Sequence, residues 1–216
     1  MLGKGRKTYM LDINKLHQAE ADFLAQYPGS FNNPAIVEMV KKHRMDKMVN
    51  MAKECFSKEA CSNVLATTDN MVKVVSRSSM VSMFEKPKFK DFVQRLNNDE
   101  KAFLVNALSE ILHGKQQAGF EAMVSILATE KLAKWSIISI IPAYYKPAKE
   151  VFVKPTTAKG ILKHFNIEDP VYKPLPSWDF YKKYRKLMND AKKEVDPSLS
   201  PSNAAFSGFL MMVLKF

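Results

Sequence analysis

The segment NNDEKAFLVNALSEILHGK, residues 97–115, carries the clearest helix signature in the chain. Asn98 is of a type that caps helix N-termini, and the acids Asp99 and Glu100 suit the positive end of a helix. Gly114 follows His113 and is the residue type that most often ends a helix. The segment therefore predicts a helix whose two ends are both specified locally.

Comparable start signals recur outward from this segment in both directions. Asn33 with Pro34 predicts one helix start, and Ser177 predicts the start of a long amphipathic helix from Trp178. Further starts are expected at Thr68 or Asp69, at Pro87, at Thr156 or Thr157, and at Ser200 with Pro201. The sequence thus predicts a mostly α fold, a multi-helical bundle or irregular helical array, with at most a small strand pair near 136–153.

The stretch WSIISIIPAYYKP, residues 135–147, leaves its own conformation open. Its β-branched and aromatic residues favour a strand. A buried helix ending at Pro142 fits equally well, because an apolar run on all sides shows no periodicity that could separate the two.

Length and composition favour one domain over residues 1–216. The chain has 46% hydrophobic residues and only seven glycines, which suits a helical protein with a real core. No long linker divides it, although its character changes near residue 134, from a helical array over 1–133 to a basic, aromatic-rich part over 134–216. The apolar segment FSGFLMMVLKF, residues 206–216, is expected to form a helix packed into the core or against a second copy of the chain.

Several chemistries lack their sequence signatures. The chain has no GxSxG, Walker A or GxGxxG motif, and its four histidines form no HxxxH or HExxH pair. Cys55 and Cys61 have a spacing typical of neither redox nor zinc motifs. We therefore expect no catalytic residue, metal or cofactor, while an enzyme with a site assembled from distant residues stays an alternative. With no secretory signal or membrane-length apolar run, we also expect a cytoplasmic protein without membrane contact.

The net charge of +11 comes from 28 lysines and five arginines against 22 acidic residues, and residues 146–193 alone carry a net +7. In this segment lysines alternate with tyrosines and a tryptophan, a composition typical of surfaces where nucleic-acid phosphates pair and bases stack. We expect nonspecific nucleic-acid binding, because arginines that could read bases are few. The candidate nucleic-acid-binding residues are Tyr145, Lys146, Lys154, Thr156, Thr157, Lys159, Lys173 and Arg185.

Two observations support a purely structural explanation for the lysines, aromatic residues and threonines of this segment. On the helix after Ser177, a core stripe is expected at Trp178, Tyr181, Tyr184 or Arg185, and Met188, and the lysines would form its solvated face. In EVFVKPTTAKGILKHF, residues 150–165, the two threonines suit an anion site at a helix start, but an ordinary capped helix explains them as well. A helical interaction or scaffold protein with incidental charge is thus the alternative function.

The last third of the chain, from VFVKPTT to DPSLSPSNAAFSGFLMM, resembles a family of uncharacterised bacterial proteins of similar length. This resemblance implies a bacterial origin, and it implies no activity or site.

Overall fold

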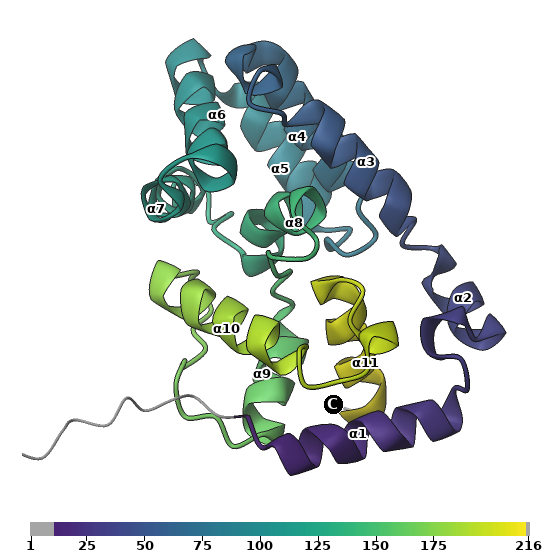
Figure 1. Ribbon diagram of the computed structural model, residues 1–216. Coiled ribbons are helices and arrows are strands. Elements are labelled where there is room, and N and C mark those ends of the chain that lie inside the picture. The colour runs from purple at the N-terminus through teal and green to yellow at the C-terminus, as the bar shows by residue number, and fades with distance from the viewer. Residues whose placement is uncertain (1–10, 215–216) are drawn as a thin grey trace, which may run out of the picture.

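The structure is a computed structural model that describes residues 11–214, and these residues form helices joined by loops (Figure 1). No strand occurs between residues 11 and 214, so the predicted mostly α fold is confirmed and the strand pair near 136–153 does not form. The helices are α1 Ile13–Gln26, η1 Ser30–Asn32, α2 Pro34–Lys41, α3 Met45–Cys55, η2 Ala60–Ser62, α4 Val64–Arg77, α5 Glu85–Arg95, α6 Asn98–His113, α7 Gln116–Ala128, α8 Trp135–Tyr145, α9 Pro155–His164, α10 Trp178–Ala191, η3 Pro197–Leu199 and α11 Asn203–Leu214.

Helix α6 lies where the sequence predicts it, but its cap is Asn97 rather than Asn98. The Asn97 side chain accepts a hydrogen bond from the Glu100 amide at 2.9 Å, and the Glu100 carboxylate accepts one from the Asn97 amide at 2.8 Å. This reciprocal capping box satisfies two backbone donors at once, and it needs the acid at the third helical position. Only Asn97 stands three residues before Glu100, and this spacing decides between the two asparagines.

Some of the other predicted helix starts are correct, and others are displaced along the chain. Asn33 and Ser177 cap α2 and α10 as expected. Helix α4 begins earlier than expected, because Asn63 accepts a hydrogen bond from the Ala66 amide at 3.0 Å. Thr68, one of the expected caps, instead lies buried within α4 and donates its hydroxyl to the Leu65 carbonyl.

Three further starts are displaced by one to three residues. Helix α5 begins at Glu85 rather than Pro87, and α11 begins at Asn203 rather than Pro201. Helix α9 has Pro155 as its first residue, so Thr156 and Thr157 lie in its first turn and do not cap it. Proline fits the first turn of a helix because its missing N–H has no intrahelical partner there.

The ambiguous stretch 135–145 is helix α8, which continues through Pro142 to Tyr145 instead of ending at the proline. Its residues from Trp135 to Tyr144 are all buried. Burial on every side explains why its sequence lacks a helical period. The extended residues after it pack on α8 without forming a strand: the Ser139 hydroxyl donates to the Trp135 carbonyl at 2.6 Å and accepts from the Val153 amide at 2.9 Å. A side chain thus supplies the hydrogen bond that a neighbouring strand would have supplied.

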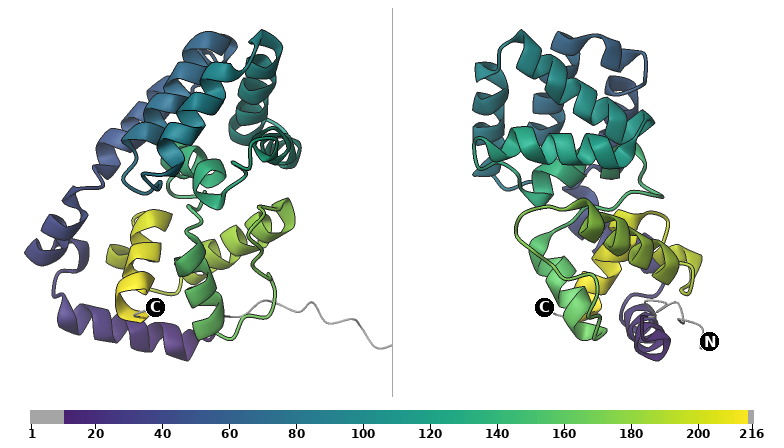
Figure 2. Two further views of the ribbon diagram at one scale, coloured as in Figure 1. Left: turned by 180° about the vertical axis from the view of Figure 1, so that it is seen from behind. Right: turned by 90° about the vertical axis from the view of Figure 1, so that its left-hand side faces the viewer.

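The helices form two groups, which Figures 1 and 2 show one above the other. The upper group consists of α3 to α8, with α4 packed against α5 and α6, α6 against α7, and α3 against α8. The lower group consists of α1, α9, α10 and α11, with α11 packed against α1 and α9. Helix α10 also contacts α7, so it connects the lower group to the upper one. Within residues 11–214, every helix is too short or too polar to cross a lipid bilayer.

Helix α11 packs into the core of the lower group, as its apolar sequence predicts. Phe206, Phe209 and Leu210 are fully buried, and the Phe209 ring meets the Phe23 ring of α1 edge-on at 5.2 Å between centroids. Met211 on the opposite side is 42% exposed. The predicted contact with a second copy of the chain is therefore not needed to cover the buried side of this helix. Residues 215 and 216 of the predicted segment lie outside the described residues.

Gly119 allows α6 and α7 to approach each other closely. A Cβ atom at this position would lie 2.6 Å from the Ala107 carbonyl oxygen and 2.6 Å from the Ile111 amide nitrogen, both of them backbone atoms of α6. Backbone atoms cannot move aside as a flexible side chain can. The packing of α6 on α7 thus depends on the absence of a side chain at residue 119.

We predict that Gly119→Ala lowers the free energy of unfolding by more than about 1 kcal/mol, because the added methyl group forces the two helices apart. The control is Gly208→Ala in α11, where an added Cβ has no heavy atom within 4 Å. It should leave stability unchanged or raise it by up to about 1 kcal/mol through better helix propensity. Urea unfolding followed by circular dichroism measures both, and equal stability of the two variants would show that the close approach is not required.

Candidate functional site

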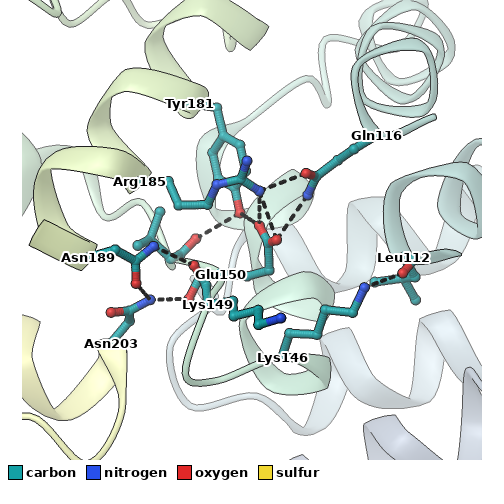
Figure 3. A network of polar contacts seen from close by, with 10 residues as sticks. Leu112, Gln116, Lys146, Lys149, Glu150, Tyr181, Arg185, Asn189 and Asn203 are labelled. Atoms are coloured by element: carbon teal, nitrogen blue, oxygen red, sulfur yellow. Dashed lines mark hydrogen bonds and ion pairs between the residues drawn. The ribbon is translucent and has the colours of Figure 1, made fainter. Parts of the chain in front are cut away.

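A buried carboxylate, Glu150, lies at the junction of the two helical groups, in the loop between α8 and α9 (Figure 3). Both of its oxygens lie 2.8 Å from the Arg185 guanidinium of α10. The Tyr181 hydroxyl donates to it at 2.8 Å, and the Gln116 amide of α7 donates at 3.0 Å. We call these four residues the Glu150 cluster.

Arg185 is held from several sides. It also donates to the Gln116 side-chain oxygen at 2.7 Å. Its guanidinium lies over the rings of Trp178 and Tyr181, at 5.6 and 5.5 Å from their centroids. The side chains of Glu150 and Arg185 are only 7% and 21% exposed. A pair this far from water is tolerated because each charge is both paired and hydrogen-bonded.

The Tyr181 hydroxyl stays protonated in this setting. Burial raises its pKa well above the usual value, and the negative charge of Glu150 raises it further. A protonated phenol is a donor, so Tyr181 can satisfy a Glu150 oxygen without adding a second negative charge. The Glu150 cluster therefore holds one negative and one positive charge in the folded state.

A second set of hydrogen bonds fixes the backbone around Glu150. The Asn203 amide, at the start of α11, donates to the Glu150 carbonyl at 3.0 Å and to the Asn189 side chain at 3.1 Å. Asn189 in turn donates to the Lys149 carbonyl at 2.8 Å. The loop after α8 is thereby attached to both α10 and α11 (Figure 3).

The predicted residues Tyr145 and Lys146 lie beside a polar cavity of about 410 Å³, which Lys146 lines with Glu150. The Lys146 ammonium donates to the Leu112 carbonyl at the end of α6 and lies 5.8 Å from the centre of the Tyr145 ring. The Tyr145 ring meets the His113 ring edge-on at 5.3 Å, and burial raises the pKa of the Tyr145 hydroxyl. We call this cavity the α6–α7 pocket.

The predicted residue Lys159 lies at a different cavity, of about 520 Å³, formed by α9 and the loop that follows it. Lys163, Asn166 and Tyr172 also line it, and the Lys159 ammonium lies 5.7 Å from the centre of the Tyr172 ring. We call this cavity the α9 pocket. Lys173, the next residue after Tyr172, is exposed, while its carbonyl accepts a hydrogen bond from the Trp135 indole at 2.8 Å.

The remaining predicted residues lie at the start of α9. Lys154 is exposed and close enough to His43 to affect it electrostatically: burial, then Lys42, then Lys154 lower the His43 pKa. Thr156 is exposed, whereas Thr157 is buried and faces the core. The predicted residues thus divide among the Glu150 cluster, the α6–α7 pocket, the α9 pocket and the start of α9, and they do not line a single cavity.

Sequence reasoning did not select Gln116, Glu150, Lys163 and Asn166 as site residues. The one available signal was Glu150 itself, a single acid in the run KPAKEVFVK, where lysines surround it. A lone acid beside apolar residues in such a basic run is a candidate for burial with a basic partner. Its partner Arg185 lies 35 residues away, and no local pattern connects the two.

Metal-binding and thiol chemistry have little support in the described part of the chain. Residues 11–214 contain no group of three or more histidine, cysteine, aspartate or glutamate side chains arranged to hold a metal ion. Cys55 and Cys61 are free thiols, half-buried and buried, and burial raises the pKa of both. A raised pKa keeps a thiol in its less reactive protonated form.

A scan against protein-family models found no matching family, and searches of curated proteins and of solved structures found no match either.

We predict that Arg185→Met lowers the free energy of unfolding by about 3–5 kcal/mol, because it leaves the Glu150 carboxylate buried without its counter-charge. The matched control is Lys186→Met, the next residue on α10, whose side chain is 70% exposed and pairs with Asp190 on the surface. Its loss should change stability by less than about 1 kcal/mol. Urea unfolding measures both, and an Arg185→Met variant as stable as its control would contradict the structural importance of the pair.

Proposed function

We propose that this protein binds nucleic acid nonspecifically, through the α9 pocket and the lysines around it. The observation that carries the proposal is the composition of this cavity: Lys159, Lys163 and Tyr172 line one hollow of about 520 Å³. Cationic side chains beside an aromatic ring form the usual combination for binding a single-stranded backbone and its bases.

The two lysines are placed to contact phosphates. Lys159 and Lys163 are four residues apart, which puts them on the same face of α9, and both are exposed. Lys173, the exposed residue that follows Tyr172 in the sequence, adds a further positive charge. Glu168 also lines the cavity and disfavours a phosphate on its own side, so the backbone should follow the α9 face.

Tyr172 and Val171 supply an apolar surface next to these lysines. The Tyr172 ring is half-buried and Val171 is 64% exposed. A base stacked on the ring would gain contact area whatever its identity, since every base has an aromatic face. The cavity is lined by lysines without arginine, and lysine grips phosphate as a point charge without reading base edges. These features support binding without sequence preference.

We predict that Lys159→Gln/Lys163→Gln weakens binding to a fluorescein-labelled oligonucleotide and flattens the slope of log affinity against log salt by about one unit per lost phosphate contact. Fluorescence anisotropy at several salt concentrations measures both effects. The control variant is Lys88→Gln/Lys90→Gln on α5, where both lysines are also exposed and the change in net charge is the same. Stability should change little in either variant, because exposed lysines contribute little to folding.

Two results would contradict the proposal. Equal loss of affinity in both double variants would show a general effect of net charge and no site at α9. Absence of binding by the unmodified protein at low salt would remove the nucleic-acid function altogether.

A second candidate function is protein–protein interaction, and one observation favours it. Met83 and Phe84, adjacent residues in the connection between α4 and α5, are each 74% exposed. Neighbouring exposed apolar side chains of this size are characteristic of interaction surfaces. If the unmodified protein binds no oligonucleotide at low salt, this pair supports the interaction function instead.

A further inference from the structure

The α6–α7 pocket has the features of a second binding site, independent of the α9 pocket. It lies where α6 ends, α7 begins and the loop after α8 passes, and its polar side chains come from Lys58, His113, Gln116, Lys146 and Glu150. Its volume of about 410 Å³ falls in the lower part of the range of small-molecule sites, about 300–1,000 Å³.

The Glu150 carboxylate, a hydrogen-bond acceptor in this lining, already accepts hydrogen bonds at both of its oxygens. One Glu150 oxygen accepts from Gln116 and Arg185, and the other accepts from Tyr181 and Arg185. The negative charge of Glu150 is likewise balanced by the Arg185 guanidinium. A ligand entering the pocket therefore finds little capacity at Glu150 to accept a further hydrogen bond.

Hydrogen-bond donors of the lining are still available to a ligand. The Gln116 amide has two N–H groups, and one of them donates to Glu150. The Lys146 ammonium has three, and one of them donates to the Leu112 carbonyl. Lys58 is exposed at the same pocket and adds a second ammonium. With Glu150 paired to Arg185, the two lysines leave the lining positively charged.

His113 adds an imidazole ring to the lining of this pocket. Its Nε2 lies 2.8 Å from the Phe56 carbonyl oxygen. A carbonyl only accepts hydrogen bonds, so Nε2 carries the hydrogen and Nδ1 is the nitrogen left over. With its hydrogen on Nε2, the ring presents Nδ1 as an acceptor for a hydroxyl group of a ligand.

We propose that the α6–α7 pocket binds a small phosphate monoester, with the phosphate held by Lys58, Lys146 and the free N–H of Gln116. Phosphate is rich in acceptors and carries negative charge, which matches a lining with spare donors and positive charge. The cavity is larger than one phosphate group requires, and the remaining space takes a small polar organic part such as a sugar.

Isothermal titration calorimetry with ribose 5-phosphate, inorganic phosphate and ribose as separate titrants tests this proposal. We expect ribose 5-phosphate to bind, inorganic phosphate to bind more weakly, and ribose to give no heat. Lys58→Gln should weaken binding of ribose 5-phosphate by about tenfold, the effect of losing one charge-assisted hydrogen bond. Lys146→Gln should do the same or more, but it also removes the bond to Leu112, so Lys58→Gln is the decisive variant.

The control is Lys53→Gln, which removes an exposed lysine from the last turn of α3, outside the pocket lining. Four results would overturn the proposal: no binding of ribose 5-phosphate, equal affinity for inorganic phosphate, equal effects of Lys58→Gln and Lys53→Gln, or binding of ribose alone. If Lys58→Gln weakens oligonucleotide binding while ribose 5-phosphate does not bind, the pocket is part of a nucleic-acid surface and the proposal is wrong. The α9 variants test the nucleic-acid function separately, so each proposal can fail without the other.

Discussion

The ion pair between Glu150 and Arg185 is the interaction on which the arrangement of the two helical groups depends. Removing two charges from water costs several kcal/mol for each ion, and only good geometry with further hydrogen bonds offsets that cost. Both Glu150 oxygens lie 2.8 Å from the guanidinium, and Tyr181 and Gln116 supply the remaining bonds. The four side chains come from α7, α10 and the loop after α8, so the complete Glu150 cluster can form only when these three segments meet.

The Glu150 cluster also determines the shape of the surfaces to which we assign functions. Gln116 is both a partner of Arg185 and a lining residue of the α6–α7 pocket, so its amide is already oriented before any ligand enters. The hydrogen bonds of Asn203 and Asn189 hold the backbone of the same loop. This loop leads through Val153 to the start of α9, where the extended chain is fixed to α8 by Ser139. Rigid attachment at both ends positions α9 and the lysines of its pocket.

Local signals predict the helices of this protein well, since caps and helix ends are encoded within a few residues. Asn33 and Ser177 are correct for this reason, and the error at α6 concerns one residue, decided by the position of Glu100. The sequence does not decide between helix and strand for α8, because a helix buried on all sides has no amphipathic period. The core stripe predicted for α10 is confirmed at Tyr181, Tyr184 and Met188, which are buried.

The candidate sites are less predictable, because they join residues that are distant in the sequence. Glu150 lies 34 residues from Gln116 and 35 from Arg185, and no spacing rule relates them. The charge of Arg185 predicts a nucleic-acid contact, yet its guanidinium is directed to Glu150 inside the protein. Lysine-rich composition defines the basic segment, but only the fold shows which lysines share a cavity: Lys159 lies with Lys163 and Tyr172, and Lys146 lies at a separate pocket.

A double-mutant cycle on Glu150 and Arg185 tests the central claim most directly. The free energy of unfolding is measured by urea titration for Glu150→Gln, Arg185→Met and the variant with both changes. If the pair unites the two helical groups, the double variant should be more stable than the sum of the single effects implies, with a coupling energy of about 1–3 kcal/mol, because neither charge is then left buried alone. Additive effects, within about 0.5 kcal/mol, would show that the two residues act independently and would contradict the account.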